Sequence, residues 1–159
     1  KSADSQAIYQ LLAQALPKVY WQENIKGKQW LKLAINCVIN PITAIDNISN
    51  GEILAVKYQA TTGRILKEIV AIAGKEKIEL SYSELIDTVK QVAKNTAQNS
   101  SSMRCDILAG RQSEIDYING YIHRLGQKHR IATPENTRLW QEVLSLTSVK
   151  KSGGKPSHS

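Results

Sequence analysis

The polar residues most able to do chemistry in this sequence are Lys32, Asn36 and Asn40, which follow one another at intervals of four. In an α-helix each interval of four drifts by about 40°, so the three side chains form one polar stripe. An ammonium group can donate a proton, and amides can bind the same molecule. The rest of the segment 28–46 is mostly apolar, so the stripe is expected inside the protein or beside a cleft. A stripe that faces water is the alternative, and the spacing alone favours neither.

Pro41 interrupts the backbone next to this stripe. Inside a helix it would bend the chain and leave the Cys37 carbonyl without its hydrogen-bond donor. Alternatively, Asn40 caps a new helix in which Pro41 is the first residue. Either interruption lies next to the stripe, and interruptions of this kind often border functional sites. Asn50-Gly51 predicts a turn soon afterwards.

A second polar segment begins at Ser100-Ser101-Ser102 and reaches Glu114 and Asp116. Serine hydroxyls and free backbone amides at a helix start can hold a carboxylate or a phosphate, although composition alone favours a serine that merely caps the helix. Helical carboxylates are usually solvated, so neither acidic residue stands out by itself. Histidines, cysteines and acidic residues nowhere show the spacing of a metal site, so none is expected.

Nearly every periodic segment predicts a helix, and the expected fold class is all-α, a helical bundle. The triplet Val19–Trp21 favours a β-strand, but it is too short to form a sheet without partners from outside the chain. Residues 150–159 are polar, and a flexible tail is expected there. The expected helices are 4–16, 28–46, 52–73 with Gly74 as its cap, one opened by the capping box Ser81-x-x-Glu84, a long segment 103–126, and a last helix that begins at Pro134 after Thr133.

Composition excludes several classes of protein. The 159 residues suit about one domain, and 42% hydrophobic and 22% charged residues are ordinary values for a globular protein. The net charge is +7, but Lys150, Lys151 and Lys155 lie in the tail, so we expect no nucleic-acid partner. No apolar run approaches the ~20 residues of a membrane span, so we expect no membrane partner. The two cysteines favour the reducing cytoplasm, and the sequence holds no GxGxxG or GxxxxGK pattern to cradle phosphates.

The two polar segments together resemble the C-terminal domain of the ketopantoate reductase (2-dehydropantoate 2-reductase) family. The similarity runs from about residue 8 to about residue 147, and the combination of motifs is much more specific than any one of them. The resemblance implies an N-terminal Rossmann domain followed by a helical domain like that of 6-phosphogluconate dehydrogenase. The matching sequences are WLKLAINCVINPITAI at 30–45, NG at 50–51, SSM at 101–103, SEIDYINGYI at 113–122 and PENTRLW at 134–140.

The resemblance also implies roles for single positions. Lys32 matches the catalytic lysine, which donates a proton to the keto oxygen of the substrate. Asn36, Asn40 and Asn50 match asparagines that bind the substrate, and Ser102 matches the serine that holds its carboxylate. These groups suit the chemistry, because hydride addition to a ketone builds negative charge on the oxygen, and an ammonium group stabilises that charge and then protonates it.

Members of this family reduce 2-dehydropantoate to (R)-pantoate with NADPH, a step in pantothenate and coenzyme A biosynthesis. Glu114 matches the carboxylate that contacts the ribose of the cofactor, and most of the NADPH would be bound by the N-terminal Rossmann domain, which this sequence lacks. Residues 1–22 are then expected to be the last helix and strand of that domain, 23–149 the helical substrate and catalytic domain, and 150–159 the tail. The piece alone is expected to be inactive, and the whole protein to be a cytoplasmic oxidoreductase.

Two alternatives stay open. The chain could be a non-catalytic helical module for association or ligand binding, although such a module has no need of a Lys–Asn–Asn row on an apolar helix. It could also belong to a sibling reductase of another 2-keto acid, because these motifs do not define the whole substrate pocket. The sequence also leaves open the choice between NADPH and NADH and whether the protein forms a homo-oligomer.

Overall fold

The structure is a computed structural model that describes residues 25–152 of the chain. Within this range it contains helices and no strand, so the expected all-α fold is confirmed. The expected helix 4–16, strand 19–21 and segment 1–22 lie outside the described residues. The elements, in chain order, are α2 (Ile25–Asp46), η1 (Asn50–Leu54), α3 (Val56–Lys75), α4 (Tyr82–Asn95), α5 (Ser102–Leu108), η2 (Ile115–Tyr117), α6 (Asn119–His129) and α7 (Pro134–Ser152), where η marks a 3-10 helix.

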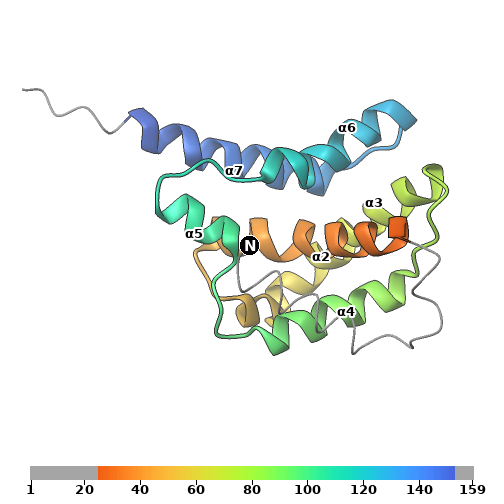
Figure 1. The fold of residues 1–159 in the computed structure, drawn as a ribbon, viewed down its shortest axis with the longest axis horizontal. Helices are drawn as coiled ribbons and strands as arrows, with labels where there is room; N and C mark the ends of the chain where they lie inside the picture. Colours follow the sequence, from red (N-terminus) through yellow and green to blue (C-terminus); the bar gives the residue numbers. More distant parts are fainter. Residues whose placement is uncertain (1–24, 153–159) are drawn as a thin grey trace, which may run out of the picture.

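α2 is the central helix of the bundle. It packs against α3, α4, α5 and α7, and Figure 1 shows α7 and α4 on opposite sides of it. Ala34, Ile35, Cys37 and Val38 have no solvent exposure. A helix that is apolar on nearly all its faces is stable only when other elements cover it, which is why the remaining helices gather around α2.

The neighbouring helices are amphipathic and bury one face each. Their apolar residues recur at intervals of three and four, so each helix presents a single stripe to the core. Ser81 is the N-cap residue of α4, as predicted, and its hydroxyl accepts a hydrogen bond from the Glu84 N–H at 3.4 Å. The buried residues of α3 and α4 include Ile65, Leu66, Ile69, Ile72, Ala73, Leu85, Val89, Val92 and Ala93.

Pro41 lies inside α2, which continues to Asp46, so Asn40 does not cap a new helix. Because Pro41 has no N–H, the Cys37 carbonyl one turn earlier has no donor within the helix. The side-chain amide of Asn119 replaces that donor, with Nδ2 at 3.0 Å from the Cys37 oxygen. The carbonyl that the sequence predicts to be orphaned therefore finds its partner in α6.

Asn119 belongs to a polar network that joins α6, α7 and α3. Its Nδ2 also donates to Oδ1 of Asn136 at 3.0 Å, and Asn136 Nδ2 donates to Glu68 at 2.7 Å. The Glu68 carboxylate accepts from the backbone N–H groups of Glu135 and Asn136, at 2.8 and 3.0 Å, and so caps the first turn of α7. Burial raises the pKa of the Cys37 thiol and the charge of Glu68 raises it further, so Cys37 remains a neutral thiol.

The predicted single helix 52–73 is wrong. η1 and α3 are separated at Ala55, whose ψ of 146° is extended. Gly74 lies inside α3 and does not cap it, because the chain leaves the helix at Lys77, which adopts a left-handed φ of 60°. The N–H of Ile78 donates back across the last turn at 2.9 Å, and the buried Ile78 side chain packs on the core. The sequence gives no signal for this end, because a lysine occupies the conformation that glycine usually takes.

The long segment 103–126 is also divided. α5 ends at Leu108, and Gly110 takes a left-handed φ of 69° in the loop that follows. η2 and α6 come after this loop, and Gly126 lies inside α6. Arg130, with a φ of 57°, ends α6 in the same way that a lysine ends α3.

The last helix, α7, begins at Pro134, as predicted. It runs to Ser152 and so enters the segment 150–159, where a flexible tail is expected. Neither lysine nor serine breaks a helix, and the first glycines of the tail follow only after residue 152.

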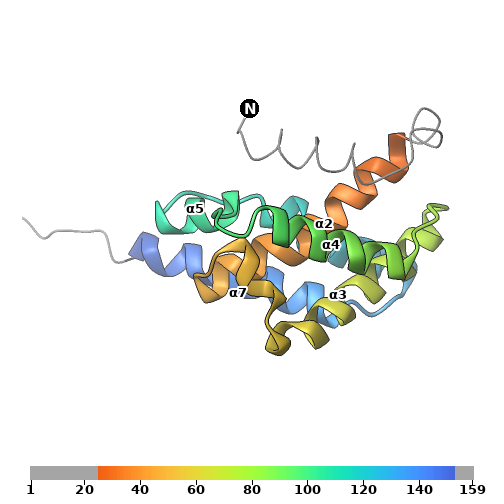
Figure 2. The same cartoon turned by 90° about the horizontal axis from the view of Figure 1, so that it is seen from below.

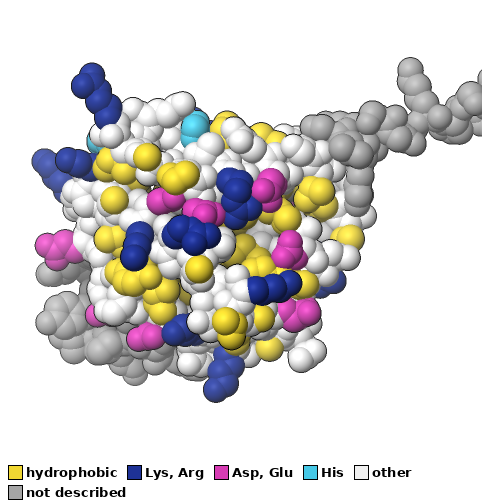
Figure 3. Space-filling model, turned by 180° about the vertical axis from the view of Figure 1, so that it is seen from behind, with side chains coloured by type: hydrophobic (Ala, Val, Ile, Leu, Met, Phe, Trp, Pro, Cys, Tyr) yellow, Lys and Arg dark blue, Asp and Glu magenta, His cyan; other side chains and the backbone are white. Residues whose placement is uncertain are grey.

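The surface mixes charges of both signs. Figure 3 shows Lys, Arg, Asp and Glu side chains interspersed on one face, with hydrophobic side chains between them. Among the large apolar side chains of the described residues, Ile25, Val56 and Tyr117 are the most exposed. None of the helices in residues 25–152 combines the length and the apolar character that crossing a membrane requires.

Gly51 allows η1 to pack closely against the turn that follows α4. In both ribbon views η1 lies beside this end of α4 (Figure 1, Figure 2). The Gly51 N–H donates to the Ala97 carbonyl at 3.1 Å, and a Cβ added to Gly51 would lie 2.6 Å from the Ala97 Cβ. A side chain at position 51 would therefore push the two segments apart.

We predict that Gly51→Ala lowers the free energy of unfolding by about 2 kcal/mol, because η1 must move away from Ala97. Gly74→Ala is the matched control: a Cβ there meets nothing within 4 Å, and alanine within α3 should stabilise the protein by about 1 kcal/mol. Urea unfolding followed by circular dichroism measures both changes. Equal effects of the two substitutions would contradict the close approach at Gly51.

Candidate active site

The six residues that pattern and family resemblance single out line one cleft. It has a volume of about 520 Å³ and lies between α2, η1, the end of α4 and the chain from residue 99 to 114. These residues come from separate stretches of sequence, so only the packing of the helices brings them together. They are Lys32, Asn36, Asn40, Asn50, Ser102 and Glu114.

The polar stripe of α2 forms one wall of the cleft. Lys32 is exposed, while Asn36 and Asn40 are half-buried, so the stripe lies beside a cleft and not inside the core. The buried Ile39 contributes an apolar part of the same wall. Within residues 25–152 the Lys32 ammonium and the two side-chain amides make no hydrogen bond or ion pair, so all three are available to a ligand.

Asn50 offers the cleft a buried acceptor. It is 8% exposed, and its Nδ2 donates to Thr96 Oγ1 at 3.1 Å. The Thr96 hydroxyl donates its own proton to the Val92 carbonyl at 2.8 Å, which determines that the Asn50 amide must be the donor between the two side chains. Asn50 Oδ1 then has no partner among the described residues, and a ligand that donates a hydrogen bond would satisfy it.

Ser101 and Ser102 are neighbours in the chain but have different surroundings. Ser101 is the N-cap of α5 and accepts from the Arg104 N–H at 3.1 Å. Its hydroxyl also lies 2.7 Å from Thr43 Oγ1, and Thr43 donates to the Ile39 carbonyl at 2.7 Å. The capping alternative thus holds for Ser101, which ties α5 to α2. Ser102 is exposed at the cleft, next to this anchored residue.

Glu114 is exposed at the edge of the cleft, just before η2. The loop that carries it is held by Asp116, whose Oδ1 accepts from Trp140 Nε1 at 2.7 Å and whose carbonyl accepts from Arg124 at 2.8 Å. Asp116 therefore positions this loop through contacts with α6 and α7. Trp140 anchors this loop through its indole N–H.

Several polar residues of the cleft were not predicted. Their positions follow from long-range packing: for example, the Asn50 N–H donates to the Asn99 carbonyl at 3.0 Å, which joins the start of η1 to the chain after α4. No local pattern distinguishes these residues from their neighbours, so the sequence offers no signal for them. They are Thr96, Asn99, Asp106 and Gln112.

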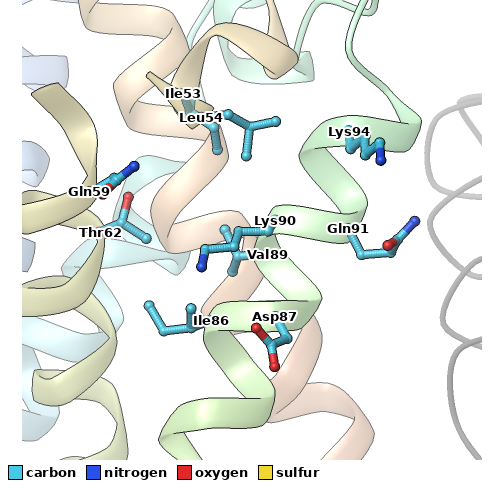
Figure 4. A pocket seen from close by; sticks show the side chains of 10 residues that line it. All are labelled: Ile53, Leu54, Gln59, Thr62, Ile86, Asp87, Val89, Lys90, Gln91 and Lys94. Atoms are coloured by element: carbon cyan, nitrogen blue, oxygen red, sulfur yellow. The ribbon is translucent and has the colours of Figure 1, made fainter. Parts of the chain in front are cut away.

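A second cavity, of about 620 Å³, lies between η1, α3 and α4 (Figure 4). Ile53 and Leu54 of η1 lie at one end, and Ile86 and Val89 of α4 line one side. None of the six predicted site residues borders this cavity. In the part of the chain that the structure describes, no group of histidine, cysteine or acidic residues could hold a metal ion.

Known proteins match this chain over most of its length. The family model for the ketopantoate reductase PanE/ApbA C-terminal region matches residues 24–146. The 2-dehydropantoate 2-reductase of Shigella flexneri is 44% identical over 143 residues, which cover 90% of this chain and 46% of that protein. The corresponding enzyme of Pyrobaculum aerophilum is 34% identical over 145 residues, which cover 91% and 52%. The chain therefore spans about half the length of the curated relatives it matches.

Solved structures show the same fold. The ternary structure of D-mandelate dehydrogenase with NADH and anilino(oxo)acetate has a TM-score of 0.78 at 28% identity, covering 81% of this chain and 43% of that one. A PanE/ApbA family ketopantoate reductase from Ralstonia eutropha JMP134 has a TM-score of 0.76 at 28% identity, with the same coverage of 81% and 43%. Sequence and fold agree: this chain belongs to the ketopantoate reductase PanE/ApbA C-terminal family.

Proposed function

We propose that the protein to which this chain belongs reduces 2-dehydropantoate to (R)-pantoate with NADPH, and that this chain supplies the proton donor and most of the substrate contacts. One observation carries the proposal. Six residues matched to functional positions of the family, scattered from Lys32 to Glu114, line a single cleft. An N-terminal Rossmann domain would complete the site from its other side.

Lys32 is the proton donor in this proposal. Its ammonium group is exposed at the cleft and makes no competing bond within residues 25–152. As the keto carbon is reduced, negative charge builds on the keto oxygen, and a cation beside that oxygen stabilises the charge and then protonates it. The hydride for this reduction is what NADPH supplies when it is bound.

The amides and the serine would bind and orient the substrate. Asn50 Oδ1, buried and without a partner among the described residues, can accept a hydrogen bond from a substrate hydroxyl. Asn36 and Asn40 stand one turn apart on the same wall as the proton donor, so they can hold the substrate at a constant distance from it. The exposed hydroxyl of Ser102 can donate to the substrate carboxylate.

Glu114 would be this chain's own contribution to cofactor binding. Its carboxylate lies exposed at the rim of the cleft and accepts hydrogen bonds, which suits the hydroxyl groups of a ribose. The remaining cofactor contacts would belong to the Rossmann domain. Both cysteines of the chain are free thiols, which supports a cytoplasmic location.

The second candidate is a sibling reductase that uses another 2-oxo acid and NADH. The fold of D-mandelate dehydrogenase, solved with NADH, matches this chain with a TM-score of 0.78, which favours this alternative. The sequence identity of 28% to that enzyme is lower than the 44% to a 2-dehydropantoate 2-reductase, and for this reason we place it second.

Steady-state assays of the full-length protein separate the two candidates. We expect kcat/KM for 2-dehydropantoate to exceed that for the 2-oxo acid of mandelate by at least about a hundredfold, and NADPH to be preferred over NADH. Oxidation of the nicotinamide cofactor, followed by absorbance, measures each combination. The opposite preference would favour the sibling reductase, and no turnover with either acid would refute the assignment as a reductase of these substrates.

We predict that Lys32→Ala lowers kcat of the full-length enzyme by about a thousandfold, because the proton donor and the cation beside the keto oxygen are lost together. Lys94→Ala is the matched control: Lys94 is an exposed lysine that lines the second cavity, and its removal should leave kcat within about twofold. Circular dichroism verifies that both variants are folded. A Lys32→Ala enzyme that keeps most of its activity would refute this assignment of the donor.

Ser102→Ala should change substrate binding, whereas Ser101→Ala should change stability. We expect Ser102→Ala to raise KM for the oxo acid about tenfold without changing the melting temperature, because it removes only a ligand contact. Ser101→Ala should instead lower the free energy of unfolding by about 1–2 kcal/mol, because it removes the cap of α5 and the bond to Thr43. Kinetics and thermal unfolding of both variants provide the comparison. A purely structural effect of Ser102→Ala would show that Ser102 does not bind the carboxylate.

A further inference from the structure

Asn119 has a role that the proposed mechanism does not use. It is the first residue of α6 and is completely buried, yet it lies outside the cleft. Both hydrogens of its amide are engaged, one by the Cys37 carbonyl and one by Asn136 Oδ1, each at 3.0 Å. The Asn136 amide is oriented in turn, because its Nδ2 donates to the Glu68 carboxylate at 2.7 Å. The network therefore presents only acceptors to Asn119 and dictates which way its amide points.

The carbonyl that Asn119 contacts belongs to the interrupted turn of α2. This turn runs from Cys37 to Pro41, and the two asparagines of the cleft wall, Asn36 and Asn40, each directly precede one of its ends. Without the helical bond that Pro41 cannot make, the backbone here is held by fewer hydrogen bonds than the rest of the helix. The position of the two asparagines relative to each other depends on how this turn is supported.

We propose that Asn119 is a positioning residue for substrate binding: by donating to the Cys37 carbonyl, it holds the interrupted turn of α2 so that Asn36 and Asn40 face the cleft together. It acts from α6, outside the cleft, and touches no substrate. The inference rests on the proposed function, because it assigns both asparagines to the substrate. It also explains why a buried asparagine, whose Oδ1 has no partner among the described residues, occupies the start of α6, where an apolar residue would pack without that loss.

A double-mutant cycle in the full-length enzyme tests this inference. Asn119→Ala removes the donor, and Pro41→Ala restores a backbone N–H that can reach the Cys37 carbonyl within the helix. We expect N119A to raise KM for 2-dehydropantoate about tenfold with KM for NADPH unchanged, and the same substitution to raise it less than about twofold in the P41A background. Asn95→Ala is the matched control, because Asn95 is exposed on α4 and its Oδ1 accepts a hydrogen bond from Gln91 on the same helix.

Each outcome of the double-mutant cycle either supports or overturns the role of Asn119. An equal rise of KM in both backgrounds, or a lower melting temperature with unchanged KM, would overturn the inference, because Asn119 would then act elsewhere or only on stability. If N119A does not fold, a folded N119A/P41A enzyme with the KM of P41A supports the inference, and an unfolded one overturns it.

Amide hydrogen exchange over residues 36–44 gives a readout that needs no turnover. We expect exchange in this stretch to be faster in N119A than in wild type and to return toward the P41A rate in the double variant; equal exchange in N119A and wild type would overturn the inference. A wild-type enzyme without turnover on 2-dehydropantoate would instead refute the proposed function, so the two failures are distinguishable.

Discussion

The arrangement of this bundle depends on a hydrogen bond that its central helix cannot make for itself. Pro41 leaves the Cys37 carbonyl without a donor in α2. The side-chain amide of Asn119 donates to this carbonyl instead, with 3.0 Å between Nδ2 and the oxygen. A buried carbonyl left without a partner would cost about 1–3 kcal/mol, a large share of the stability of a domain of this size. The start of α6 must therefore lie against the middle of α2. Asn136 and Glu68 extend the same constraint to α7 and α3, so that polar contacts define where these helices sit and apolar side chains fill the space between them.

The other side of α2 has a polar contact of its own. Thr43 and Ser101 lie 2.7 Å apart, and this contact ties the start of α5 to the helix one half-turn beyond the proline. The cleft lies where these anchored segments meet η1 and the end of α4. Its candidate functional groups are thereby attached to helices and turns held by these contacts, while Lys32 and Ser102 remain exposed at its surface. Such a division suits the proposed catalysis, since the groups proposed to contact the substrate are free and the residues next to them are held.

Local signals in the sequence were reliable where one residue sufficed to produce them. The proline at the start of α7 and the serine cap of α4 lie where predicted, because a missing N–H and a hydroxyl acceptor act within a single turn. The helix ends at Lys77 and Arg130 were missed, since residues other than glycine adopt left-handed conformations there only with tertiary support. Likewise, the periodicity of 52–73 is compatible with one helix, and the docking of η1 against Ala97 divides it.

The sequence by itself determined the fold class, the polar stripe of α2 and the orphaned carbonyl, because helical periodicity and the chemistry of proline are local properties. Together with the family resemblance it also named the six residues of the cleft. Only the tertiary structure decided that the stripe faces a cleft, that Ser101 and not Ser102 caps α5, and that Asn119 completes α2 from 82 residues away. These outcomes depend on which surfaces of the helices meet, and burial of apolar area across the whole chain selects that arrangement.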